Sequence, residues 1–128
     1  MVANNTNPLK VLIVDDDKSV LFIFNKILKK VGCHISTLET GEETLRNLES
    51  NKYDTAIIDV NLQDMNGLNL LASVNKMAPN MKKIILTGSP SETDKIRSEK
   101  YGADYYLVKP IPSKKLVEIV TNSEKFIY

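Results

Sequence analysis

Short apolar runs alternate along this chain with longer segments whose apolar residues recur every three or four positions. The runs contain mostly β-branched, leucine and aromatic side chains, and they are too short to form helices. Most are apolar throughout, which favours parallel strands covered on both faces. The predicted strands are Val11–Val14, Ile35–Leu38, Thr55–Ile58, Ile84–Leu86 and Tyr105–Val108.

A predicted helix follows each strand. The clearest stripe of apolar residues runs from Val20 to Val31, and Gly32 follows as a residue that can end a helix with a positive φ. The segment Ser91–Tyr101 is thinly apolar, and we expect Ile96 and Tyr101 to make its inward contacts. The other predicted helices are Glu42–Ser50, a segment from Leu68 to Ala78 that Pro79 ends, and Ser113–Glu124 with Ser113 as its N-cap.

Five strand–helix pairs in succession predict an α/β fold. Right-handed crossovers would place helices on both faces of a doubly wound, five-stranded parallel sheet with strand order 2-1-3-4-5, a flavodoxin-like (βα)5 arrangement. A length of 128 residues fits one domain. We assign residues 9–128 to this single domain and interpret residues 1–8, MVANNTNP, as a disordered lead-in.

Composition excludes several classes of protein. The 17 basic and 16 acidic residues give a net charge of +1, so no basic excess indicates direct binding to nucleic acid. Cys33 is the only cysteine, which excludes an internal disulfide and favours a reducing, cytoplasmic location. No apolar run approaches the length of about 20 residues that a membrane span requires. The lysine doublets are predicted to be solvated surface charge: Lys29–Lys30, Lys82–Lys83 and Lys114–Lys115.

Polar residues with a common chemistry stand where the predicted strands end. Asp15 and Asp16 follow the first strand, Asp59 the third, Thr87 the fourth and Lys109 the fifth. In the order 2-1-3-4-5 the first and third strands are neighbours, so the three carboxylates converge and repel one another. Mg²⁺ prefers oxygen ligands of this kind. With a cation beside it, the carboxylate of Asp59 is a candidate nucleophile toward phosphorus.

Four motifs carry a resemblance to a known family. VLIVDDD, AIIDVNLQDMNG, ILTG and YYLVKP occur in this order over nearly the whole chain, and together they resemble the receiver domain of two-component response regulators. The resemblance implies that Asp59 is the phosphoacceptor. It also implies that Asp15 and Asp16 bind Mg²⁺ together with Asp59 and the backbone carbonyl of Asn61, Asp16 being the more direct ligand of the acidic pair.

The resemblance extends to the residues that would respond to phosphorylation. Thr87 and Tyr106 correspond to the family's switch pair, and Lys109 corresponds to its invariant lysine, which is joined to Pro110 by a cis peptide bond. Two positions depart from the family pattern, because Gln63 stands where a proline is usual and Gly88 where an alanine is common.

The partners that the resemblance implies are proteins. A histidine kinase or phosphotransfer protein would supply the phosphoryl group. The face formed by the fourth helix, fifth strand and fifth helix would then control a downstream effector or an output domain missing from this sequence. A phosphorylation-dependent homodimer is a further candidate. Such a domain is a signalling module, with limited self-phosphorylation and autodephosphorylation as its only expected activity.

Three other functions compete with this interpretation. A phosphatase of the haloacid-dehalogenase type needs a second aspartate two residues after the nucleophile, and Asn61 in that position cannot supply a proton. A flavodoxin-like electron carrier needs a hydroxyl- and glycine-rich loop after the first strand, where this chain has three aspartates. A degenerate receiver that binds partners without phosphorylation would not need the complete acidic set.

Overall fold

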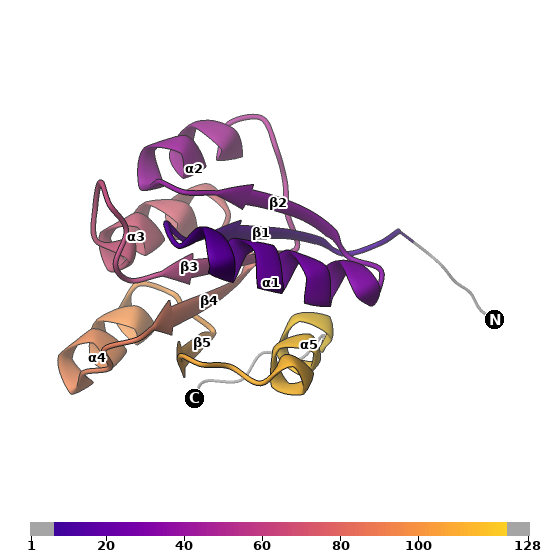
Figure 1. Cartoon of the computed structure of the whole chain (residues 1–128). Coiled ribbons are helices and arrows are strands. Elements are labelled where there is room, and N and C mark those ends of the chain that lie inside the picture. The colour runs from indigo at the N-terminus through magenta and orange to yellow at the C-terminus, as the bar shows by residue number, and fades with distance from the viewer. Residues whose placement is uncertain (1–6, 123–128) are drawn as a thin grey trace.

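Five strands form one parallel sheet in the computed structural model, which describes residues 7–122 (Figure 1). The sheet order is β2-β1-β3-β4-β5, as predicted. The two strands beside each other at its centre, β3 and β4, are buried along their whole length, whereas β2 lies at an edge and is largely exposed. The strands are β1 (Lys10–Val14), β2 (His34–Leu38), β3 (Thr55–Asp59), β4 (Lys82–Thr87) and β5 (Tyr105–Val108).

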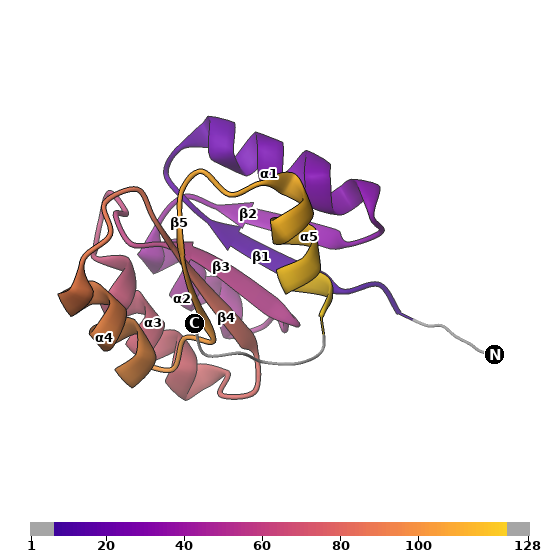
Figure 2. The ribbon, with the colours of Figure 1, turned by 90° about the horizontal axis from the view of Figure 1, so that it is seen from below.

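Helices cover both faces of the sheet, which confirms the doubly wound α/β prediction (Figures 1 and 2). One face carries α1 (Lys18–Lys30) and α5 (Ser113–Thr121). The other carries α2 (Gly41–Leu48), α3 (Gly67–Met77) and α4 (Glu92–Lys100). Gly32 follows α1 with φ of +93°, as predicted for the residue that ends this helix.

Successive side chains of the central strands point to opposite faces of the sheet and pack into two separate apolar cores. In β1, Val11 and Ile13 pack with side chains of α1 and α5, whereas Leu12 and Val14 pack with those of α3. Burial of each large aliphatic side chain contributes about 1.5–3 kcal/mol. A continuous apolar strand is therefore required, because each of its faces meets a helical layer.

The inward face of α4 differs from the prediction. Ile96 does not anchor the helix, because its side chain is 60% exposed, and the buried residue is Ser98 instead. Residues two apart on a helix point to nearly opposite sides, so burial of Ser98 turns Ile96 outward. The Ser98 hydroxyl donates to the carbonyl of Lys95 at 2.8 Å. Tyr101, at the end of the helix, is half-buried against the second core, as expected.

The predicted cap of α5 is wrong. Pro112 occupies the N-cap position, no side chain accepts a hydrogen bond there, and Ser113 is the first helical residue. Because Ser113 already has helical geometry, its hydroxyl does not have the N-cap placement. The predicted end of this helix at Glu124 lies outside the described residues. So does most of the predicted lead-in, of which the structure describes Asn7 and Pro8 as exposed.

Lys82 and Lys83 are buried, which contradicts their prediction as surface charge. The Lys83 ammonium donates to the carbonyls of Met81 at 2.7 Å and Pro79 at 3.3 Å. That of Lys82 donates to the carbonyl of Ile119 at 2.7 Å and to that of Asn122. Both residues begin β4, a central strand whose entry is covered by neighbouring segments, so their charges are solvated by the backbone instead of water. The doublets Lys29–Lys30 and Lys114–Lys115 are exposed, as predicted.

Candidate functional site

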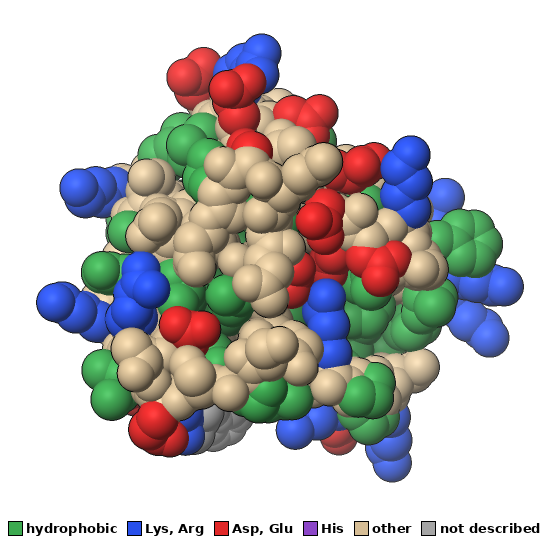
Figure 3. All heavy atoms as spheres, turned by 60° about the vertical axis from the view of Figure 1, so that its left-hand side comes forward, with side chains coloured by type: hydrophobic (Ala, Val, Ile, Leu, Met, Phe, Trp, Pro, Cys, Tyr) green, Lys and Arg blue, Asp and Glu red, His purple; other side chains and the backbone are tan. Residues whose placement is uncertain are grey.

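Three carboxylates meet at the edge where the strands end. Asp15 directly follows β1, Asp16 comes next, and Asp59 is the last residue of β3. Because Val14 of β1 pairs with Ile58 of β3, the residues that follow them are neighbours across the sheet edge. One carboxylate oxygen from each aspartate lies within 4.8 Å of the others. Figure 3 shows acidic side chains gathered beside a basic one on this side of the molecule.

Burial distinguishes the three acids. Asp15 is 1% exposed and Asp59 5%, whereas Asp16 is exposed. The Asp15 carboxylate accepts a hydrogen bond from the amide of Asp17 at 2.9 Å, and Asp17 caps α1 by accepting the amide of Ser19. Asp17 is thus a helix cap, and the other two members of the DDD run remain for the acidic cluster.

Lys109 provides the cation of this cluster. Its Nζ lies 2.9 Å from Oδ2 of Asp15 and 3.2 Å from Oδ1 of Asp59, so a single ammonium bridges the two buried carboxylates. The Lys109 amide donates to the carbonyl of Thr87 at 2.8 Å, and the following peptide bond to Pro110 is cis. Side-chain and backbone contacts together hold the lysine over the ends of β1 and β3.

The electrostatic balance of the site is incomplete. Burial raises the pKa of Asp59 above its ordinary value, the charge of Asp15 raises it further, and Lys109 only partly offsets these effects. Burial by itself would lower the pKa of Lys109, but the hydrogen bond and charge of Asp15, together with Asp59, raise it. Three carboxylates against one ammonium leave an excess of negative charge that a divalent cation would neutralise.

The loop after β3 is held by close backbone packing. The amide of Gly67 donates to the carbonyl of Val60 at 2.6 Å, and Asn61 pairs with Asn66 in an isolated antiparallel bridge. A Cβ at position 67 would collide with the carbonyl oxygen of Asp59, so only glycine fits there. No sequence pattern assigned a role to Gly67, although the Asn-Gly step before a helix was a signal for such a tight approach.

Thr87 and Tyr106 lie on neighbouring strands but have different partners. Thr87 is fully buried at the end of β4, and its hydroxyl accepts the amide of Ser89 at 3.0 Å. Tyr106 of β5 is also buried. Its hydroxyl accepts the amide of Ser91, the N-cap of α4, at 3.2 Å and donates to the carbonyl of the same residue at 3.5 Å. The tyrosine therefore links β5 to the beginning of α4.

The donors at this site fit a hard divalent cation. Within residues 7–122, the acidic side chains that lie close enough together to share one metal ion are those of Asp15, Asp16 and Asp59. Each would offer a carboxylate oxygen as its ligand atom. Oxygen ligands without histidine or cysteine favour Mg²⁺ or Ca²⁺ over Zn²⁺. The backbone carbonyl of Asn61, two residues after Asp59, is the further oxygen that the resemblance assigned.

None of the helices within residues 7–122 combines the length and the apolar character needed to cross a bilayer.

Comparisons with known proteins identify the same pattern. A family model described as the response regulator receiver domain matches residues 11–121. The transcriptional regulatory protein GlrR of Escherichia coli is 33% identical over 116 residues, which cover 91% of this chain. The two-component response regulator ARR11 of Arabidopsis thaliana is 39% identical over 111 residues, or 84% of this chain.

The solved structures agree with the sequence relatives. A CheY-like receiver domain protein from Methanospirillum hungatei superposes with a TM-score of 0.86 and 36% identity, covering 88% of this chain and 90% of that one. The curated relatives are longer, because the matched region spans 26% of GlrR and 21% of ARR11.

Proposed function

The chain belongs to the response regulator receiver domain family, and on that premise we propose that it accepts a phosphoryl group on Asp59. The observation that carries the proposal is the convergence of Asp15, Asp16 and Asp59 beside the ammonium of Lys109. We propose Mg²⁺ as the cofactor, held by these three carboxylates and the backbone carbonyl of Asn61.

The residues of the site supply the chemistry of phosphoryl transfer. An oxygen of Asp59 attacks the phosphorus of a phosphohistidine, the phosphorus–nitrogen bond breaks, and the imidazole leaves with the electron pair. The product is a mixed anhydride, which water can hydrolyse. Lys109 keeps a positive charge beside the attacking carboxylate, and bound Mg²⁺ would neutralise the phosphoryl oxygens. This chemistry describes a signalling module that is modified reversibly.

A change in the partner of Thr87 would couple phosphorylation to the surface. The Thr87 hydroxyl, which now accepts the amide of Ser89, can instead donate to a phosphoryl oxygen on Asp59. Movement of this loop would disturb the contact of Tyr106 with Ser91 at the start of α4. A population swing from 1:99 to 99:1 needs about 5.5 kcal/mol, which two or three charge-assisted hydrogen bonds of about 1.5–3 kcal/mol can provide.

We propose a histidine kinase or phosphotransfer protein as the phosphodonor and a protein effector or an output domain as the recipient of the signal. The face formed by α4, β5 and α5 is the candidate output surface. It exposes Ile96 of α4 at 60% and Val108 of β5 at 45%, an apolar pair that a partner or a second copy of the chain could cover. The relatives support an output domain, since GlrR is a transcriptional regulator and extends well beyond the matched region.

Intact-mass measurement after incubation with acetyl phosphate and Mg²⁺ tests the phosphoacceptor. We expect one phosphoryl group on the wild-type chain and none on Asp59→Asn or in the presence of a chelator. Asp94→Asn, which removes an acid on α4 outside the cluster, is the matched control and should be phosphorylated like the wild type. Phosphorylation of Asp59→Asn to the wild-type extent would overturn the assignment.

A further inference from the structure

The loop between β3 and α3, residues 60–66, connects the acidic cluster to the second helical layer. It follows Asp59 directly and contains Asn61, whose carbonyl is the proposed backbone ligand. Its two ends are held together by the bridge between Asn61 and Asn66. The segment VNLQDMN contains no proline, so its conformation depends on contacts with its surroundings.

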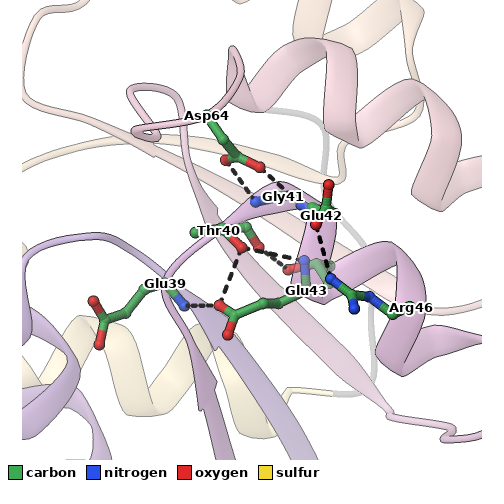
Figure 4. Close-up of polar contacts among 8 residues, drawn as sticks. Glu39, Thr40, Gly41, Glu42, Glu43, Arg46 and Asp64 are labelled. Atoms are coloured by element: carbon green, nitrogen blue, oxygen red, sulfur yellow. Dashed lines mark hydrogen bonds and ion pairs between the residues drawn. The ribbon is translucent and has the colours of Figure 1, made fainter.

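The tip of this loop is fastened to α2 by one carboxylate. Oδ1 of Asp64 accepts the amide of Gly41 at 2.9 Å, and Oδ2 accepts the amide of Glu42 at 3.0 Å (Figure 4). These amides belong to the first turn of α2, where backbone donors lack partners within the helix. The side chain of Met65, the next residue, packs so closely on Gly41 that a Cβ there would collide with its sulfur. Two consecutive loop residues thus contact the same turn.

Helix α2 has a separate cap of its own. Thr40 accepts the amide of Glu43 at 3.1 Å, and the Glu43 carboxylate accepts the amide of Glu39 at 3.3 Å (Figure 4). Thr40 and Glu43 thus cap the helix from its own N-terminal segment, although Glu43 accepts the amide before the N-cap residue and not that of Thr40 itself. Because Thr40 accepts one first-turn amide without contacting the loop, substitution of Thr40 weakens the cap of the helix and leaves the attachment of the loop through Asp64 in place.

We propose that Asp64 is a positioning residue for the metal site, which holds loop 60–66 against α2 and thereby fixes the carbonyl of Asn61 for Mg²⁺. The inference rests on the proposed function, since it assigns a role toward the cation of that site. The carboxylate of Asp64 acts through the loop backbone and does not itself bind the ion. Residues that orient metal ligands in this way commonly change metal affinity by 10- to 100-fold when they are removed.

The attachment predicts a reciprocal effect. If the contact of the loop with α2 increases the affinity for Mg²⁺, then bound Mg²⁺ must strengthen the contact of the loop with α2 by the same free energy, because coupling between two sites is mutual. Binding of the ion should slow hydrogen exchange at the amides of Gly41 and Glu42, which donate to Asp64. A purely local helix cap would show no such response to the metal.

Mg²⁺ titration without any phosphodonor, followed by backbone amide chemical shifts, tests the proposal. We expect Asp64→Ala to weaken Mg²⁺ binding about tenfold and to abolish the slowing of exchange at Gly41 and Glu42. Asp64→Asn should fall between Asp64→Ala and the wild type, because its single amide oxygen can still accept a hydrogen bond. Thr40→Ala, the matched control, removes the cap of the helix but keeps the loop attachment, so it should bind Mg²⁺ like the wild type.

The results separate the two claims. Wild-type affinity in Asp64→Ala, with normal Mg²⁺ binding and phosphorylation of the wild-type chain, would overturn the positioning role and leave the proposed function intact. Equal weakening by Thr40→Ala would also overturn it, because the effect would then come from the stability of α2. Absence of Mg²⁺ binding by the wild-type chain would overturn the proposed function and this inference together.

Discussion

Charged side chains are buried at both ends of the sheet, but different groups compensate their charges at each end. Where the strands end, Asp15 and Asp59 share the single ammonium of Lys109. Where β4 begins, Lys82 and Lys83 donate their hydrogen bonds to backbone carbonyls. The first end keeps an excess of negative charge, whereas the second has its ammonium groups solvated by fixed dipoles.

This difference assigns the two ends different roles: the lysine end stabilises the fold, and the aspartate end is suited to binding a cation. At the lysine end, the ammonium of Lys82 reaches the carbonyls of Ile119 and Asn122, which lie at the C-terminal end of α5, where a positive charge is favourable. Those contacts join β4 to α5 and solvate the ammonium in place of water. At the aspartate end, repulsion between the carboxylates lowers the stability of the fold in the absence of a bound cation. A cation that binds there removes this repulsion, and the free energy released increases its affinity for the site.

The largest effect on stability is expected at the lysine end. Lys83→Ala removes a buried stem and leaves the carbonyls of Met81 and Pro79 without this donor, so the free energy of unfolding should fall by about 2–4 kcal/mol. Urea denaturation measures it. Lys114→Ala, an exposed lysine on α5, is the control and should change stability by less than about 0.5 kcal/mol. Similar stabilities of the two variants would show that the buried ammonium does not hold this end together.

Lys109→Met should destabilise the other end, and the loss should depend on pH. Removal of the ammonium leaves Asp15 and Asp59 to repel each other, at a cost of about 1–3 kcal/mol near neutral pH. As the pH falls, the Asp59 carboxylate, whose pKa is raised by burial and then by the charge of Asp15, takes up a proton, and the cost should shrink. Denaturation at pH 7 and pH 4 checks this, and an equal loss at both values would contradict an electrostatic origin.

Mg²⁺ should stabilise the wild-type chain through the aspartate end alone. At a concentration ten times the dissociation constant, the gain is about 1.4 kcal/mol, and a chelator should reverse it. Thermal unfolding with and without the ion measures this gain. Asp59→Asn should lose most of it, while Lys114→Ala should keep it. A gain of the same size in Asp59→Asn would place the cation elsewhere.

Asp59→Asn should make the metal-free protein more stable at pH 7. Burial, and then the charge of Asp15, raises the pKa of Asp59 above its ordinary value of 3.8. An acid with a raised folded-state pKa costs stability as the pH rises from 3.8 through that pKa. The advantage of the variant should therefore vanish below about pH 4 and be complete above the raised pKa. Denaturation curves across this range test the sign, and a loss of stability at pH 7 would contradict it.

Sequence patterns predicted the architecture well, because each strand and helix is coded locally. The strands began and ended within two residues of their predicted positions, and the glycine after α1 was confirmed. The predicted apolar stripe of α1 was right for Phe24 and Leu28, which are buried. It was wrong for Ile23 and Val31, which are 51% and 48% exposed, while Leu21 is buried in their place. The order of the strands followed from repeated strand–helix pairs and the handedness of their crossovers. These rules need no knowledge of side-chain contacts.

The errors concern side chains whose surroundings come from distant segments. The Lys82–Lys83 doublet looks like surface charge until the loop before β4 and the end of α5 supply carbonyls to it. Ile96 is apolar, but α4 buries Ser98 in its place. The contact of Asp64 with Gly41 joins residues that are 23 positions apart, and no periodicity reveals such a pair.

The acidic cluster was predictable for the opposite reason. Asp15, Asp16 and Asp59 each follow an apolar strand, so the topology alone brings them to one edge of the sheet. What the topology could not supply was the degree of burial. Asp15 and Asp59 are buried whereas Asp16 is exposed, and this difference shapes the electrostatics of the site.

A crystal structure with Mg²⁺ and beryllofluoride, an analogue of the phosphoryl group, tests the central claim most directly. The account predicts beryllofluoride attached to an oxygen of Asp59 and Mg²⁺ about 2.1 Å from oxygens of Asp16, Asp59 and the Asn61 carbonyl, with the less direct ligand Asp15 and the ammonium of Lys109 beside them. Mg²⁺ bound away from these residues, or an Asp59 carboxylate directed away from the cluster, would contradict it.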